Sequence, residues 1–112
     1  MYRRDELLCL NILEACKKIE SISKKFNNYE EFGQDTISFD ASLMNFIVIG
    51  EMANKLSDDF RKMNTKIEWV KIISFRNFIA HDYFGIDAEE VWEIVKRDIP
   101  GLLKTISDLI PK

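Results

Sequence analysis

The sequence contains few of the residues that mark common metal-binding and disulfide-linked proteins. Its 112 residues include one His and two Cys, and no Cys-x-x-Cys or Cys/His cluster is present, so a zinc site is not expected. Cys9 and Cys16 are seven residues apart, two turns along one helix face, which is too far for a disulfide within that helix. We therefore predict that both are small core residues.

Long apolar runs and an excess of positive charge are also missing. No segment approaches the ~18 continuous apolar residues of a membrane span. The opening stretch, "MYRRDELLCL", is not followed by the apolar region and small-residue cleavage site of a secretion signal. The net charge of −3 argues against a protein that coats nucleic acid through bulk positive charge. The sequence thus predicts a cytoplasmic protein with one domain, residues 1–112.

Helical periodicity dominates the chain, and strand signals are nearly absent. Apolar residues between Leu8 and Phe26 recur at spacings of three and four, which is the period of one face of an α-helix. Similar stripes predict four long helices, over about residues 3–26, 40–56, 66–81 and 88–109, with short helical turns at 29–32 and after residue 57. The predicted fold class is therefore all-α, a bundle of four long helices with short connecting helices.

Side chains that can accept a hydrogen bond from the first turn of a helix predict where the helices begin. Asp40 or Ser38 is a candidate N-cap for the second long helix. Asp87 is the candidate N-cap of the last helix, and Glu90 three residues later predicts a capping box.

Glycine and proline residues predict three local features of the helices: a break between two of them, a kink in one and a close contact between two. Gly85 is expected to separate the third helix from the fourth. Pro100 should kink the fourth helix, because it removes a backbone donor and crowds the carbonyl of Lys96. Gly50 and Ala53 share one stripe and predict that another helix approaches the second one closely.

Three aromatic residues are left over once the predicted core is filled. Trp92, Tyr83 and Phe84 are expected to cluster near the end of the third helix, where they would form a subunit interface.

The stretch "RNFIAHDYFG", residues 76–85, is the most unusual part of the sequence. It holds Arg76, the only His (His81), Asp82 and Tyr83 within eight positions. Cleavage of RNA without a metal needs a base for the ribose 2′-OH, an acid for the leaving 5′-oxygen and a cation for the charged phosphorane. Histidine suits the first two roles, and the planar guanidinium of Arg suits the third.

With one His in the chain, the base and the acid would have to be His81 from two subunits. Arg76 and His81 are also about 140° apart around one helix, so a two-fold dimer would complete a site that one subunit lacks. A second interpretation stays open from the residues alone: Arg76 pairs with a nearby carboxylate, and His81 caps a helix end.

The order of several segments resembles a known family. An Arg and a His with four to six residues between them are the signature of the HEPN superfamily of small all-α ribonucleases, and a Tyr two residues after the His is similar to its HepT-like branch. Four further segments match in order: "ILEACKKIESI" at 12–22, "YEEF" at 29–32, "NFIVIGEMANKLS" at 45–57 and "VWEIVKRDIPGLL" at 91–103.

The resemblance implies a homodimeric, metal-independent endoribonuclease that needs no cofactor. Arg76 and His81 would be its catalytic residues, with Asn77, Asp82 and Glu51 in supporting roles. Glu51 would orient Arg76 or His81 from the neighbouring helix, or it is simply a solvated or structural carboxylate.

The resemblance also implies the toxin of a prokaryotic type II/VII-like toxin–antitoxin pair. Its antitoxin would be a minimal nucleotidyltransferase that attaches AMP to the motif tyrosine, here Tyr83, and so silences the nuclease. Met44 stands where many relatives have a basic residue, and Met52 replaces a small one. The loss of charge at Met44 keeps a second hypothesis open, in which the bundle is a non-catalytic binding partner or substrate of the nucleotidyltransferase. A third is that the polar motif only stabilises a dimer interface.

Overall fold

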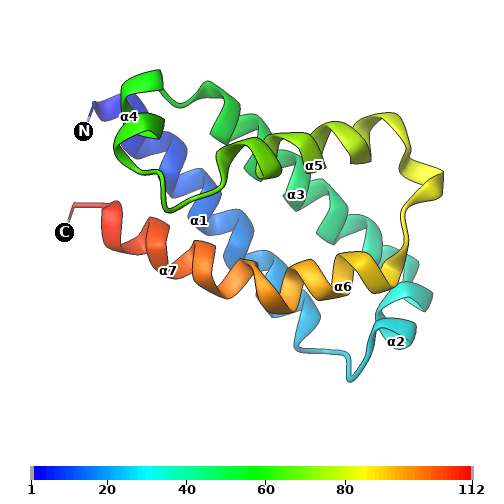
Figure 1. Ribbon diagram of the computed structural model, residues 1–112. Coiled ribbons are helices and arrows are strands. Elements are labelled where there is room, and N and C mark those ends of the chain that lie inside the picture. The colour runs from blue at the N-terminus through cyan, green and yellow to red at the C-terminus, as the bar shows by residue number, and fades with distance from the viewer. Residues whose placement is uncertain (1, 112) are drawn as a thin grey trace.

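The computed structural model describes residues 2–111 and shows a helical bundle with no strand among them. Its elements are α1 (Arg3–Ser23), α2 (Tyr29–Gln34), α3 (Thr36–Lys55), α4 (Asp58–Met63), α5 (Trp69–His81), the 3-10 helix η1 (Tyr83–Gly85), α6 (Ala88–Arg97) and α7 (Ile99–Leu109). Helices α6 and α7 follow one another almost end to end, so the bundle has four long rods (Figure 1). The predicted all-α architecture is confirmed.

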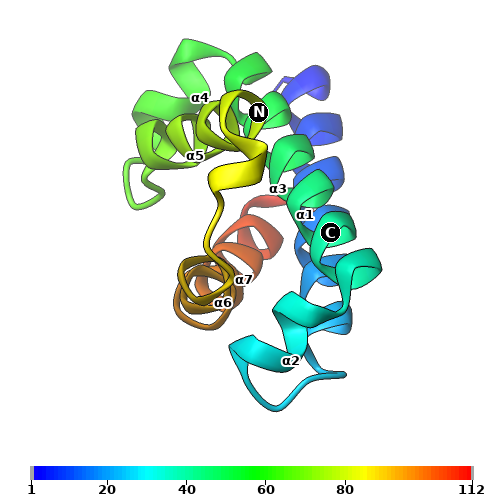
Figure 2. The same ribbon diagram turned by 90° about the vertical axis from the view of Figure 1, so that its right-hand side faces the viewer.

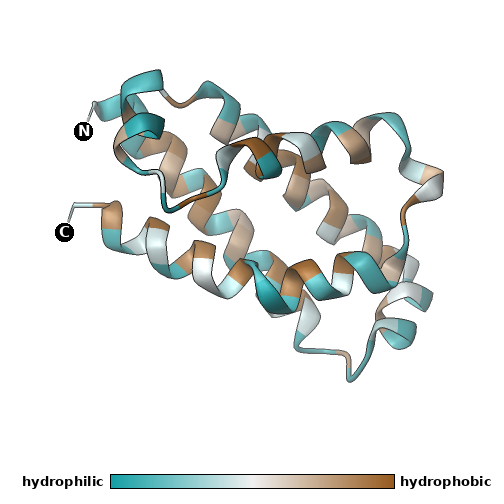
Figure 3. Cartoon of the chain, in the orientation of Figure 1, coloured by the Kyte–Doolittle hydropathy of each residue, from teal (hydrophilic) through white to brown (hydrophobic). Residues whose placement is uncertain are grey.

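Helix α3 is the central rod, because it packs against α1 on one side and α5 on the other. Helix α7 packs along α1, and the short α2 packs against α6 (Figures 1 and 2). The apolar bands of the long helices alternate with hydrophilic ones (Figure 3). The buried stripes meet in one core, which includes Ile12, Cys16, Ile19, Phe32, Leu43, Ile49, Ala53, Ile79, Val91, Val95 and Ile106. None of the helices in residues 2–111 is both long and apolar enough to span a membrane.

Both cysteines are buried in the face of α1 that contacts this core, as predicted, and neither forms a disulfide. Burial raises the pKa of Cys9 to about 11 and that of Cys16 to about 12. The thiols therefore stay protonated at neutral pH, and a protonated buried thiol is a poor nucleophile.

Several helix ends differ from the sequence prediction. Helix α1 ends at Ser23 and not near 26, and Phe26 instead turns back onto Phe32, with ring centroids 5.9 Å apart. Helix α3 begins at Thr36, because the side chain of Asp35 accepts a hydrogen bond from the Ser38 N–H (3.0 Å). The proposed caps Asp40 and Ser38 were therefore wrong, and both residues lie inside the helix. Helix α5 begins at residue 69, three residues later than predicted.

The last predicted helix is two helices separated by Asp98. Pro100 sits in the first turn of α7, where its missing N–H costs nothing, so it begins a new helix instead of kinking one. Asp87 does cap α6, accepting a hydrogen bond from the Glu89 N–H (3.1 Å). The second bond of a capping box, from the Asp87 N–H to the Glu90 carboxylate, is not found among the described residues.

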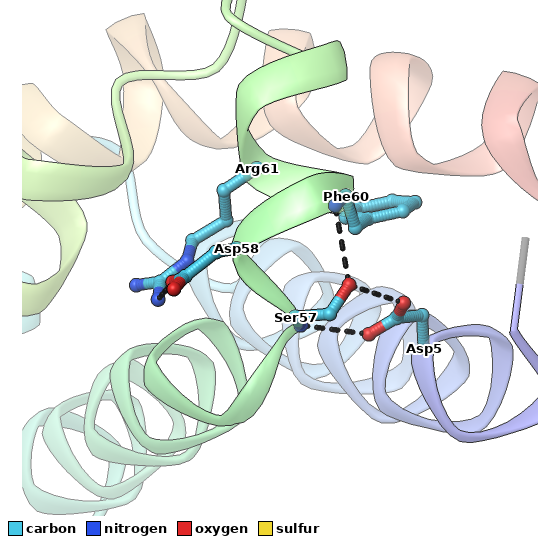
Figure 4. A network of polar contacts seen from close by, with 5 residues as sticks. All are labelled: Asp5, Ser57, Asp58, Phe60 and Arg61. Atoms are coloured by element: carbon cyan, nitrogen blue, oxygen red, sulfur yellow. Dashed lines mark hydrogen bonds and ion pairs between the residues drawn. The ribbon is translucent and has the colours of Figure 1, made fainter.

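A buried carboxylate fastens α4 to α1 (Figure 4). Asp5 is 2% exposed and accepts two hydrogen bonds from Ser57, from its backbone N–H (2.9 Å) and its hydroxyl (2.8 Å). The same hydroxyl accepts the Phe60 N–H and caps α4. A negative charge at this helix start also complements the helix dipole.

Replacement of Asp5 with alanine is expected to lower the free energy of unfolding by about 1–3 kcal/mol, because it leaves the half-buried donors of Ser57 without their acceptor. Denaturant titration followed by circular dichroism measures the change. Asp59→Ala, which removes an exposed acid from the first turn of the same helix, is the control and should cost less than about 1 kcal/mol. Equal losses in the two variants would show that the Asp5–Ser57 contact contributes little.

Candidate active site at the end of helix α5

A close approach of α3 and α5 positions Arg76. A Cβ built on Gly50 of α3 would overlap the Cβ of Arg76 and lie 2.7 Å from its Cγ. Only glycine lets the backbone of α3 come this near to the stem of Arg76. The close contact predicted from the stripe of Gly50 and Ala53 is therefore confirmed, and it falls on the candidate catalytic arginine.

The guanidinium of Arg76 is held by two neighbours. Its Nη2 forms an ion pair with Glu51, and its Nη1 donates a hydrogen bond to the Asn77 side chain (3.0 Å). These contacts use two of the five N–H donors of the group and leave three, of which the buried Nε–H has no partner among residues 2–111. The Arg76 side chain remains 30% exposed, so the paired guanidinium still borders solvent. Glu51 thus contacts Arg76, as an orienting role requires. The same pair is also what the second interpretation predicted, in which Arg76 pairs with a nearby carboxylate.

His81 is the last residue of α5 and is exposed. Asp82 follows as the C-cap with a non-helical backbone (φ −138°, ψ 47°), which ends the helix before Gly85. The structure shows no hydrogen bond from the His81 side chain to any described residue, so the capping role considered for it is not observed. It also does not bring His81 and Arg76 into contact within one subunit.

Tyr83 is tied back to α3. Its hydroxyl donates a short hydrogen bond to the carboxylate of Asp40, although both residues are exposed. The bond to Asp40, with a smaller effect of desolvation and of the Asp40 charge, raises the pKa of Tyr83. Sequence reasoning assigned Asp40 to a helix cap and missed this contact.

The two carboxylates that hold the motif lie on one face of α3. Asp40 and Glu51 are eleven residues apart, which is three turns and only about 20° of rotation. Asp40 holds Tyr83, Glu51 holds Arg76, and Met44 lies between the two acids on the same stripe, 59% exposed. The segment from Arg76 to Tyr83 is therefore anchored at both ends along one surface strip of α3. The eleven-residue spacing was the sequence signal that could have found Asp40.

The Asp40–Tyr83 bond makes a testable prediction for the titration of the tyrosine. In Asp40→Asn the carboxylate charge is removed, so we expect the pKa of Tyr83 to fall toward its ordinary value. Because the folded-state pKa is raised, the contribution of this bond to stability is present below about pH 10 and is lost as the pH rises past the raised value.

Tyrosinate absorbance against pH measures this shift. Tyr2 and Tyr29 contribute a background, so the control is the same Asp40→Asn change in a Tyr83→Phe chain, where the titration curve should not move. A shift that persists without Tyr83 would contradict the assignment.

The predicted aromatic cluster is only partly formed. Tyr83 and Phe84 pack edge to face with ring centroids 5.1 Å apart. Trp92 instead packs on Phe32 (5.4 Å) and lies under the ammonium of Lys96 (4.5 Å from the ring centroid). The inclusion of Trp92 was wrong, because its ring fills the contact between α6 and α2.

Two cavities of about 440 and 510 Å³ open on the described part of the bundle, and both are lined by residues other than those of the motif. Within residues 2–111 no group of three or more His, Cys, Asp or Glu side chains is arranged to hold a metal ion.

Comparison with known proteins agrees with this geometry. Residues 12–109 match the family described as "Ribonuclease HepT-like". The chain is 30% identical over 103 residues to "Putative RNase TTE0752" of Caldanaerobacter subterraneus subsp. tengcongensis, covering 91% of this chain and 90% of that protein. It is 31% identical over 107 residues to "Putative RNase MJ1380" of Methanocaldococcus jannaschii, covering 95% and 97%. It is 32% identical over 92 residues to "Probable ribonuclease HepT" of Thermococcus cleftensis, covering 82% and 83%. No solved structure matches the chain.

The helical bundle and these matches define a small all-α RNA-cleaving enzyme. The chain belongs to the HepT-like ribonuclease family of the HEPN superfamily, and its class of activity is that of an endoribonuclease.

Proposed function

We propose that the chain cleaves RNA as a homodimer, at a metal-independent site built from Arg76 and His81 of both subunits. The observation that carries the proposal is the position of the only His in the chain, exposed at the end of α5 and five residues after a guanidinium held by Glu51 and Asn77. One such half-site has one imidazole, whereas general acid–base cleavage of RNA uses two proton-transfer groups.

Exposed apolar side chains around the motif support a subunit interface there. Met44 on α3 is 59% exposed, Phe78 on α5 is 42% exposed, and Ile37 at the start of α3 is 83% exposed. Exposed apolar residues gathered on neighbouring elements are typical of protein contacts.

In the proposed mechanism one His81 takes the proton of the ribose 2′-OH, and the oxygen attacks the adjacent phosphorus. The bond to the 5′-oxygen breaks, and the second His81 protonates that leaving group. Arg76 stabilises the charged phosphorane through its remaining N–H donors, while Glu51 and Asn77 hold its guanidinium in place. Asp82, as the C-cap of α5, fixes the backbone that carries His81. The products are a 2′,3′-cyclic phosphate and a 5′-hydroxyl.

A ribonuclease assay on purified protein tests this mechanism. We expect cleavage of single-stranded RNA to persist in a chelator and to leave 2′,3′-cyclic phosphate ends, with the protein eluting as a dimer. A substrate that lacks the 2′-OH at the cut should be inert. Cleavage of that deoxy substrate, or a monomer with full activity, would contradict the proposal.

We further propose that the protein is the toxin of a toxin–antitoxin pair, silenced when a nucleotidyltransferase attaches AMP to Tyr83. Tyr83 is 42% exposed and follows His81 by two residues. Its hydroxyl is bonded to Asp40. A phosphodiester on that hydroxyl would place bulk and negative charge beside the path of the RNA phosphate. Incubation with such a partner and ATP should add one AMP to the wild type and none to Tyr83→Phe, as read by mass spectrometry.

A second candidate function is a non-catalytic partner or substrate of the nucleotidyltransferase. The engaged guanidinium of Arg76 and the uncharged Met44 on the same surface strip favour it. Modification of Tyr83 fits both functions, and only the nuclease assay separates them.

A further inference from the structure

Phe84 is the most exposed large apolar side chain of the described chain, at 98%. It lies in η1, one residue after Tyr83 and three after His81. The phenyl ring therefore gains none of the free energy that burial would supply, and both of its faces are open to a ligand.

The ring is carried on a fastened segment. Tyr83 packs edge to face against Phe84 (5.1 Å), and the Tyr83 hydroxyl is bonded to Asp40 on α3. The carbonyl of Asp82 accepts the Gly85 N–H (3.0 Å) and closes the turn. Phe84 is thereby presented from a defined turn.

The position of η1 bears on what the ring contacts. It lies at the end of the bundle opposite α4, beyond the point where α5 ends (Figure 1). A dimer contact through α3 and α5 would leave Phe84 at the margin of the shared cleft, where an RNA strand enters and leaves. The ring is separate along the chain from Ile37 and Met44 of the proposed subunit contact, and it follows His81 by three residues.

We infer that Phe84 stacks on a base of the RNA substrate next to the cleaved phosphate, with Tyr83 and Asp40 as positioning residues for the ring. Bases of single-stranded RNA stack on exposed aromatic side chains, and this contact tolerates different sequences because every base has a flat face. The inference rests on the proposed Arg76–His81 site, since it places the base beside that phosphate.

Cleavage of an RNA oligonucleotide with a mapped cut tests the contact. We expect Phe84→Ala to lose about five- to a hundred-fold in kcat/KM, mainly through KM, and Phe84→Trp to retain activity. Met63→Ala is the matched control, because Met63 is 83% exposed on α4 at the other end of the bundle. An abasic nucleotide at the stacked position should weaken cleavage by the wild type as much as Phe84→Ala does, and the two changes together should cost no more than either alone.

A binding measurement makes the test independent of cleavage. In an inactive His81→Ala background, a strand carrying 2-aminopurine at that position should show stacked, quenched fluorescence that is lost when Phe84→Ala is added. Equal quenching with and without the Phe84 ring would overturn the inference. So would an equal loss of kcat/KM by Phe84→Ala on the intact and the abasic strand. Dissociation of the dimer by Phe84→Ala would also overturn it, because the ring would then be a subunit contact. If His81→Ala is inactive while Phe84→Ala is normal, only the stacking is wrong; if His81→Ala cleaves normally, the proposed site is wrong.

Discussion

Replacement of His81 with alanine is expected to abolish RNA cleavage and leave the fold unchanged. Each proton-transfer role contributes about 10²–10⁴-fold to a rate, and in the proposed dimer this one substitution removes both the base and the acid. His81 is exposed and makes no side-chain hydrogen bond to the described residues, so the change in unfolding free energy should stay within about 0.5 kcal/mol. Initial rates on single-stranded RNA and thermal unfolding of the same samples measure the two effects.

The same variant also shows whether the site is shared between subunits. If wild-type and His81→Ala chains are unfolded, mixed in equal amounts and refolded, about a quarter of the dimers carry two imidazoles. Activity should then fall to about one quarter of the wild-type value and vary with the square of the wild-type fraction. A fall to one half, linear in that fraction, would mean that each subunit has its own complete site. An active His81→Ala protein would exclude the catalytic role altogether, and a large loss of stability would favour a purely structural role for the motif.

The long helices could be predicted from the sequence because their apolar stripes have a clear period. The end of α5 at His81 and the caps Ser57 and Asp87 also follow from local residue types. The start of α3 could not be placed, because Asp35, Ser38 and Asp40 each carry a side chain that can cap a helix, and the structure uses Asp35. Asp98 divides the last rod where the periodicity continues without interruption.

In the candidate site, too, features set by neighbouring residues could be predicted, and contacts between residues far apart in the sequence could not. The motif itself is contiguous, so Arg76, His81 and Tyr83 could be selected by spacing alone. The partners on α3 could not, because the pairings of Arg76 with Glu51 and of Tyr83 with Asp40 depend on the register between two helices. That register is set by packing around Gly50, a contact between residues 26 positions apart in the sequence.

Replacement of Gly50 with alanine is expected to be among the most damaging single changes in the bundle. The added methyl group would overlap the Cβ of Arg76 and sit 2.7 Å from its Cγ, so α3 and α5 must move apart. Overpacking of this kind costs about 1–3 kcal/mol, which corresponds to a fall in Tm of roughly 5–15 °C. A displacement of about 1 Å at Arg76 can also reduce the rate about 10²-fold, because catalysis depends on its position relative to the phosphate.

Gly101→Ala is the matched control, because a Cβ at Gly101 in α7 meets nothing within 4 Å. Alanine there should leave cleavage unchanged and raise stability by up to about 1 kcal/mol through its higher helix propensity. The Arg76→Gly change separates the two effects of Gly50→Ala, because it removes both atoms that the new Cβ would overlap. Glycine within α5 itself costs about 1 kcal/mol, so Arg76→Gly should destabilise the Gly50→Ala chain less than it destabilises the wild type. Without the arginine, cleavage should be lost in both chains. Thermal unfolding and initial rates of the single and double variants test this coupling. Additive losses of stability would show that Gly50 and Arg76 act independently, and that the approach of α3 to α5 does not fix the position of the arginine.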